Sequence, residues 1–150
     1  MKKKLLAAIF IFAIFGFLSL SEFKLSRKQL LESLSQSSPT ITIESYPNQI
    51  DINTPSSIAW KIESKQKTNS TSTAIYYDYE STPSAVTRQD HPNALGYQYH
   101  TNDYFQGSFP IPYTFSANLP PSRKGTVYFR GYAFVNGEHL WTDEYQILVK

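Results

Sequence analysis

The sequence predicts an all-β protein, a two-sheet antiparallel sandwich of about seven strands preceded by an N-terminal hydrophobic helix. Three observations predict this class. After residue 38, apolar residues recur at every second position in short runs bounded by Pro, Asn, Ser or Gly. No run there has the helical period, and the chain of 150 residues without cysteine suits one domain with no disulfide framework. Two sheets are needed because an open sheet would leave one apolar face in water.

The first 21 residues have the layout of an export signal. Lys2–Lys4 form a cationic head, and residues 5–20 follow as a run without a charge that we expect to contact the membrane. Two interpretations stay open: a signal peptide cleaved near Ser21, or a retained signal-anchor helix. As a helix the run would span about 24 Å, somewhat less than the roughly 30 Å of a hydrocarbon core. The charge bias places the rest of the chain outside the cytoplasm in either case, membrane-anchored or secreted.

Residues 22–38 carry a partial helical stripe and predict a stalk or linker. The Ser- and Pro-containing break at 36–39 ends this pattern, so we expect the globular domain to occupy residues 39–150. Period-two runs then predict the strands. They cover Ile41–Ile43, Ile58–Ile62, Ile75–Tyr79, Phe115–Leu119 and Thr126–Val135, followed by Leu140–Val149.

Two stretches between these strands lack a clear period. Lys65–Ser72 contains no apolar residue and predicts a polar loop. Ser84–Pro112 is rich in Pro and Gly and predicts an irregular insert with one short strand near Tyr97–His100.

The C-terminal end carries the sharpest local signal. Asn136-Gly137 is the preferred pair for a type I′ hairpin turn, because both central positions of that turn need a positive φ. The returning strand is expected to place Trp141 on one face together with Tyr145, Ile147 and Val149.

Three segments resemble fibronectin type III-like domains. Ser57–Lys61 is similar to their second strand, Gly125–Ala133 to their sixth and Trp141–Ile147 to their last, in the right order. The resemblance implies an immunoglobulin-like sandwich, and it implies a fold rather than a function. The chain departs from the family in its larger insert. In addition, Tyr128 lies on the face opposite Phe129, so it is not assigned as the family's corner tyrosine.

Charge and motifs exclude several functions. Residues 39–150 hold 8 Lys and Arg and 10 Asp and Glu, a formal net charge of −2, which predicts no nucleic-acid binding. The spacing of His91, His100 and His139 matches no metal-ligand motif, and no nucleophile elbow, zinc-protease motif or phosphate loop is present. We therefore expect no enzymatic activity, no bound metal and no cofactor.

An excess of tyrosine marks a candidate binding patch. Its expected members are Tyr97, Tyr99, Tyr104, Tyr128, Arg130 and Tyr132. The alternative interpretation is structural, since tyrosine suits strands and forms cross-strand pairs. Asn69 starts an Asn-Ser-Thr sequence and is a possible glycosylation site.

These features predict a non-catalytic extracytoplasmic binding or structural module that engages an unknown surface protein or glycan. The first alternative is a carbohydrate-binding sandwich that uses Tyr97, Tyr99 or Trp141 for stacking. The second is a pilin-like filament subunit, which the missing processing site before Leu5 disfavours.

Overall fold

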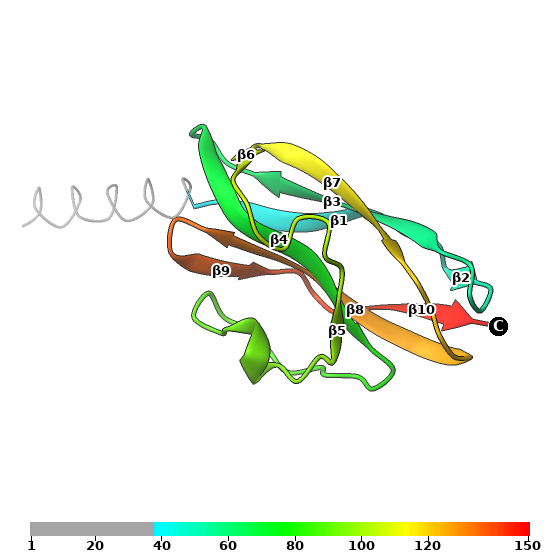
Figure 1. The fold of residues 1–150 in the computed structure, drawn as a ribbon. Coiled ribbons are helices and arrows are strands. Elements are labelled where there is room, and N and C mark those ends of the chain that lie inside the picture. The colour runs from blue at the N-terminus through cyan, green and yellow to red at the C-terminus, as the bar shows by residue number, and fades with distance from the viewer. Residues whose placement is uncertain (1–37) are drawn as a thin grey trace, which may run out of the picture. The chain divides into compact units, whose positions relative to one another are not determined.

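A computed structural model describes residues 38–150, of which Pro39–Lys150 form one compact unit (Figure 1). The expected signal or anchor at 1–21 and all but the last residue of the expected stalk at 22–38 lie outside the described residues. Within residues 38–150 there is no helix with the length and apolar character needed to cross a membrane.

The unit consists of two β-sheets. One sheet has three strands in the order β1-β3-β7, namely β1 (Thr40–Ser45), β3 (Ser56–Glu63) and β7 (Tyr113–Leu119). The other has seven strands, with the path β2-β10-β8-β4-β5. Its members are β2 (Gln49–Ile50), β4 (Thr68–Asp78), β5 (Tyr99–His100), β6 (Phe109–Ile111), β8 (Gly125–Val135), β9 (Glu138–Trp141) and β10 (Tyr145–Val149). Strand β6 pairs with β4, and β9 pairs with β8.

The strand order identifies the architecture. All paired strands are antiparallel except β2 and β10. Six strands have five or more residues: the first, second and fourth of these (β1, β3, β7) form one sheet, and the third, fifth and sixth (β4, β8, β10) lie in the other. This is the connectivity of an immunoglobulin-like sandwich. The predicted all-β, immunoglobulin-like fold is confirmed.

The core lies between the two sheets and follows the predicted alternation. Ile58, Trp60 and Ile62 of β3 are fully buried, and Trp60 stacks on Phe115 with ring centroids 5.9 Å apart. The one polar atom of the indole is satisfied, because Trp60 Nε1 donates to Thr73 Oγ1 at 2.7 Å. This hydrogen bond offsets the cost of removing the indole N–H from water.

The C-terminal hairpin is confirmed, with positive φ at Asn136 (53°) and Gly137 (82°). The expected face of Trp141 is wrong. Trp141 pairs with Tyr132, and Tyr145 pairs with Phe129. Between these two pairs the returning chain advances by four residues while β8 advances by three. The extra residue between β9 and β10 turns Trp141 to the outer face and Tyr145 to the core face.

The predicted polar loop at Lys65–Ser72 is also wrong for most of its length. Strand β4 begins at Thr68, and its polar start pairs with β6 and β8. Ser70 is fully buried, yet its hydroxyl donates to the carbonyls of Ser72 and Phe134. This polar segment is stable in the sheet because its buried hydroxyl donates hydrogen bonds to backbone carbonyls.

The irregular insert has a definite path over the seven-stranded sheet. Residues 81–98, here called the strap, leave the end of β4 and return to β5; they include the 3₁₀ helix η1 (Pro92–Ala94). In Figure 1 the strap is the green segment on the side of this sheet away from β3 and β7. It therefore covers the outer face of the sheet, which in a simple sandwich faces water.

Candidate binding site

A pocket of about 380 Å³ opens on the outer face of the seven-stranded sheet. Four parts of the chain form it: β4, the strap, the segment after β5 and the β8–β9 hairpin. Four of its rings are Tyr76, Phe105, Tyr132 and Phe134. We call this the outer-face pocket. Its volume lies in the range of pockets that bind small molecules.

The floor of the pocket follows from strand geometry. Tyr76 and Tyr132 lie on the outer face of neighbouring strands, with their rings edge-to-face at 5.4 Å between centroids. Trp141 does not line the pocket but packs on Tyr132, with ring centroids 4.6 Å apart. Burial raises the pKa of Tyr76 to about 12 and also raises that of Tyr132, so both phenols are neutral at physiological pH.

Two histidines form one side of the pocket. His91 of the strap and His139 of β9 lie with ring centroids 5.3 Å apart. His139 Nδ1 is 2.9 Å from the Tyr132 hydroxyl, and His91 Nδ1 accepts from the backbone N–H of Asn93 at 3.2 Å. Burial, and then the proximity of His91, lower the pKa of His139 below its ordinary 6.5. His100 lies apart from this pair, stacked on Phe105 at 4.2 Å.

The histidines do not form a metal centre with carboxylates. Among residues 38–150, no group of three or more His, Cys, Asp or Glu side chains is arranged to hold a metal ion. His91 Nδ1 acts as an acceptor, so the proton of its neutral ring is on Nε2, and neither nitrogen offers a lone pair to a ligand in this arrangement.

A buried arginine fixes the strap to the sheet. Arg130 of β8 is 4% exposed, and its side chain makes four hydrogen bonds. Its acceptors are the Tyr97 hydroxyl (3.1 Å), the Thr142 carbonyl (2.9 Å) and the carbonyls of Thr82 and Ser84 (3.1 Å each). Three of these four acceptors belong to the strap. Hydrogen bonds from a charged donor are among the stronger ones in proteins.

Glu144 completes this network from the loop after β9. Its carboxylate accepts from the Ser81 hydroxyl (2.6 Å), the Tyr97 hydroxyl (2.6 Å) and the Thr82 N–H (2.8 Å). Burial opposes ionisation, but these hydrogen bonds and nearby Arg130 outweigh it, so the pKa of Glu144 is lowered. The Tyr97 hydroxyl thus lies between the two charges, accepting from one and donating to the other.

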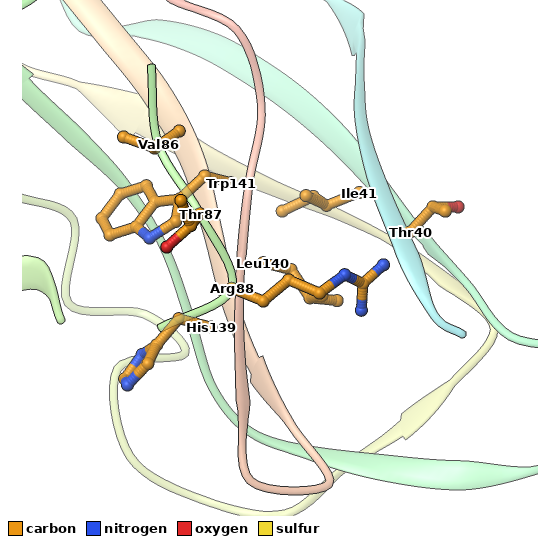
Figure 2. Close-up of a pocket in the computed structure, with 8 residues that line it drawn as sticks. All are labelled: Thr40, Ile41, Val86, Thr87, Arg88, His139, Leu140 and Trp141. Atoms are coloured by element: carbon orange, nitrogen blue, oxygen red, sulfur yellow. The ribbon is translucent and has the colours of Figure 1, made fainter. Parts of the chain in front are cut away.

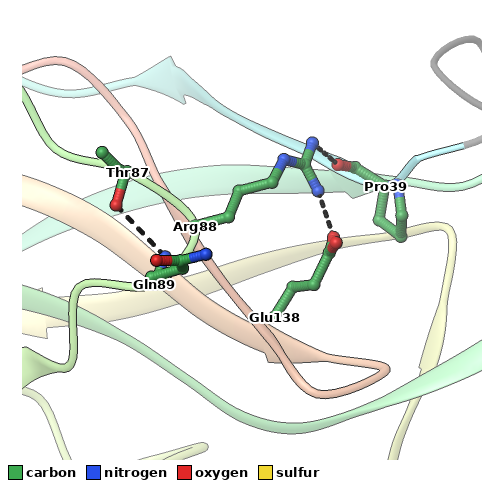
Figure 3. A network of polar contacts seen from close by, with 5 residues as sticks. All are labelled: Pro39, Thr87, Arg88, Gln89 and Glu138. Carbon is green, nitrogen blue, oxygen red and sulfur yellow. Dashed lines mark hydrogen bonds and ion pairs between the residues drawn. The ribbon is translucent and has the colours of Figure 1, made fainter.

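The far side of the strap is held at the sheet edge. Arg88 pairs with Glu138 at 2.6 Å and donates to the Pro39 carbonyl at 2.7 Å (Figure 3). Figure 2 shows Arg88 extending from the strap toward Thr40, beside a second pocket of about 270 Å³. The backbone N–H of His139 donates to the backbone carbonyl of Arg88 at 3.0 Å, so the strap also pairs with the outer edge of β9.

The six residues of the expected patch do not form one exposed surface. Tyr99 is 42% exposed and stacks on Tyr77. Tyr104 packs on Trp60 and Phe115 of the core. Tyr97 and Tyr128 are half-buried, whereas Arg130 and Tyr132 are each 4% exposed. The expectation that Arg130 and Tyr132 lie on an exposed surface is corrected. Both side chains lie on the outer face of the sheet, as their parity predicts, but the strap covers this face.

Two further expectations concern single residues. Asn69 is exposed, but it lies in β4 opposite Pro110 rather than in a loop. Trp141 is half-buried, and its indole Nε1 donates to the Asp90 carbonyl of the strap at 2.9 Å. Trp141 therefore contacts the strap, to which Tyr97 belongs, whereas Tyr99 lies on β5.

Of the residues that line the pocket, the patch expected from the sequence contains only Tyr132. Phe134 lies on the outer face with Tyr132, two positions away, and parity could have found it. Phe105 and His139 join the pocket through the paths of two loops, which no local pattern in the sequence encodes.

Comparisons with known proteins add nothing on function. No protein-family model matches the chain, and no curated protein sequence matches it. Among solved structures, the chain is similar to the PKD domain of an M14-like peptidase from Thermoplasmatales archaeon SCGC AB-540-F20. The identity is 13% and the TM-score 0.46, over 74% of this chain and 91% of that one.

Two other solved structures show similar levels of likeness. The CARDB domain of the PF1109 protein from Pyrococcus furiosus has 12% identity and a TM-score of 0.42, over 75% of this chain and 93% of that one. A superoxide reductase (neelaredoxin) from Ignicoccus hospitalis has 16% identity and a TM-score of 0.39, over 74% and 80%. The immunoglobulin-like assignment therefore rests on the strand order and pairing given above.

Proposed function

We propose that the protein is a non-catalytic binding module that acts outside the cytoplasm, and that the outer-face pocket is its binding site. The pocket supports this because four separate segments converge on it and two charged residues, Arg130 and Glu144, hold its cover in place. A surface built in this way is preorganised for a ligand. The export signal read from residues 1–21 supports the location.

The observation that carries the ligand class is the lining of the pocket. It combines aromatic rings with hydroxyl, amide and imidazole groups and contains no Lys, Arg, Asp or Glu. An uncharged ligand with one apolar face and several hydroxyls fits this combination, because aromatic rings stack on the C–H face while the polar groups accept and donate hydrogen bonds. We propose a neutral pyranose, alone or as part of a glycan.

A glycan array tests this, followed by titration of the best glycan against variants. Phe105→Ala and Phe134→Ala each remove a half-buried ring of the pocket and should weaken binding by roughly tenfold or more, about 1.4 kcal/mol. Tyr113→Ala is the matched control, since Tyr113 is 57% exposed on β7, outside the pocket. A flat array, or binding that Tyr113→Ala weakens and the Phe variants leave unchanged, contradicts the proposal.

The location is tested separately. In Figure 1 the described chain begins at one end of the sandwich and the C-terminus lies at the other, and Lys150 is exposed. A tag after Lys150 should therefore be accessible to protease on intact cells. A tag that stays protected contradicts an extracytoplasmic domain.

A further inference from the structure

Protonation offers a way to control the strap, because the two histidines that join it to the sheet are next to each other. His91 belongs to the strap and His139 to β9, with ring centroids 5.3 Å apart. Histidine is the side chain whose charge changes between about pH 5 and pH 8. Two imidazolium rings at this separation repel each other, and the repulsion acts directly across the contact between strap and sheet.

The hydrogen bond of His91 adds a second reason. His91 is the N-cap of η1, and its Nδ1 accepts from the N–H of Asn93. A protonated imidazole carries a hydrogen on both nitrogens and has no acceptor left. Protonation of His91 therefore removes the cap of η1 and places two donors against each other.

Several other charged or titratable groups face the pair from the neighbouring elements. Asp90 of the strap accepts from the N–H and hydroxyl of Thr87, which lower its pKa, so it stays ionised. Arg88 and Glu138 pair with each other, and burial keeps the phenol of Tyr132 on β8 neutral. Tyr76 on β4 is likewise neutral, and His100 on β5 stacks on Phe105. His91 and His139 are the two titratable rings that meet between the strap and β9, whereas His100 lies on β5.

We propose that the His91–His139 pair opens the strap in acid. With both rings neutral, residues 87–93 lie on β9 and narrow the outer-face pocket. With both protonated, this part of the strap separates from β9 and uncovers Tyr132 and Trp141. The effect on ligand binding rests on the function proposed above, whereas the opening itself does not.

The contacts that must break are specific. Two of them are the bond from the His139 backbone N–H to the Arg88 carbonyl (3.0 Å) and the bond from the Trp141 indole to the Asp90 carbonyl (2.9 Å). The side chain of Arg88 must also leave Glu138 (2.6 Å) and the Pro39 carbonyl (2.7 Å). The other end of the strap stays in place, because Glu144, whose pKa is lowered, remains ionised and holds Ser81 and Thr82. Opening is therefore a hinged local change and leaves the core intact.

The two tryptophans make this testable by fluorine NMR on the full chain labelled with fluorotryptophan and kept in a mild detergent. Trp141 bonds to the strap, while Trp60 is fully buried in the core. Between about pH 7.5 and pH 5, the Trp141 resonance should shift as the open fraction rises by roughly tenfold or more. The Trp60 resonance should not move, which shows that the fold persists.

Variants assign the effect to the pair. His91→Asn keeps an N-cap acceptor without a titratable ring and should abolish the shift. His139→Gln should also abolish the shift. If His91→Asn moves the Trp60 resonance, and so disturbs the core, His139→Gln serves as the test in its place. His100→Asn is the control and should leave the shift unchanged. The proposal is overturned if the Trp141 resonance does not move, or if it moves equally in His91→Asn and His139→Gln.

Binding of the best glycan at the two pH values separates this inference from the proposed function. A pH-dependent Trp141 shift without glycan binding at either pH supports the opening and contradicts the ligand class. Binding without any Trp141 shift supports the ligand class and contradicts the opening.

Discussion

Replacing Arg130 by Met tests how strongly the strap is fixed to the sheet. Methionine keeps most of the apolar stem of the side chain but none of its hydrogen bonds. Arg130 is 4% exposed and makes four of them, three to acceptors in the strap. The change therefore leaves a buried tyrosine hydroxyl and three backbone carbonyls without their donor.

The size of the loss follows from the cost of breaking a buried charged network, about 3–5 kcal/mol when one partner is removed. The carbonyls of Thr82 and Ser84 can regain water if the strap lifts, and this limits the loss in the free energy of unfolding to that range. Lysine at this position keeps the charge but not the planar fork, so Arg130→Lys should lose about half as much.

Urea denaturation of the full chain measures this, with Arg123→Met as the control. Arg123 is exposed and lies over the Tyr79 ring at 4.1 Å, so its loss should cost about 1 kcal/mol or less. If Arg130→Met and Arg123→Met lose the same small amount, the network does not hold the strap and the reasoning fails.

Three more predictions concern the core and the pH dependence of stability. Thr73→Val leaves the Trp60 indole N–H without an acceptor and should lower the free energy of unfolding by about 1–3 kcal/mol, measured by urea denaturation. Gly131→Ala places a methyl 3.1 Å from one side chain of β1 and 3.1 Å from another in the loop after β9, and should cost about 1–3 kcal/mol, read from the melting temperature. The stability should fall in two steps as the pH is lowered. The pKa of His139 is lowered from 6.5, so its contribution is complete above pH 6.5 and is lost below it; the pKa of Glu144 is lowered from 4.5, so its contribution is lost only below pH 4.5.

Controls for these predictions come from exposed or non-titrating positions. Thr42→Val, at an exposed site of β1, should change the free energy of unfolding by about 0.5 kcal/mol or less. If Thr73→Val loses no more than Thr42→Val, the Thr73 hydroxyl does not stabilise the core. Gly131→Ala with an unchanged melting temperature would show that the sheets can separate at no cost. His139→Gln should abolish the upper step of the pH profile and keep the lower one, and a profile with both steps intact would exclude His139 as the cause of the upper step.

The strands could be predicted from the sequence because burial imposes the period of two on them. Ile58, Trp60 and Ile62 are buried as their alternation requires, and the Asn136-Gly137 turn has the positive φ values that its residues favour. Trp141 was assigned to the wrong face because a single extra residue before Tyr145 reverses parity. Nothing in the local pattern marks that residue.

The candidate site was harder to predict for a different reason. Parity placed Arg130 and Tyr132 correctly on the outer face, but the strap that buries them follows a path set by contacts more than 30 positions away, such as Arg130 with Tyr97. His91 and His139 meet for the same reason, 48 positions apart in the sequence. The chemistry of this face depends on a loop, and loop paths have no period.

Amide hydrogen exchange of the full chain at neutral pH tests the placement of the strap most directly. Two backbone amides report on it: Thr82, which donates to Glu144, and His139, which donates to the Arg88 carbonyl. We predict that both exchange at least about a hundredfold more slowly than in an unstructured peptide. Exchange at the unprotected rate at both would mean that the strap does not lie on the sheet, and the pocket beneath it would not exist.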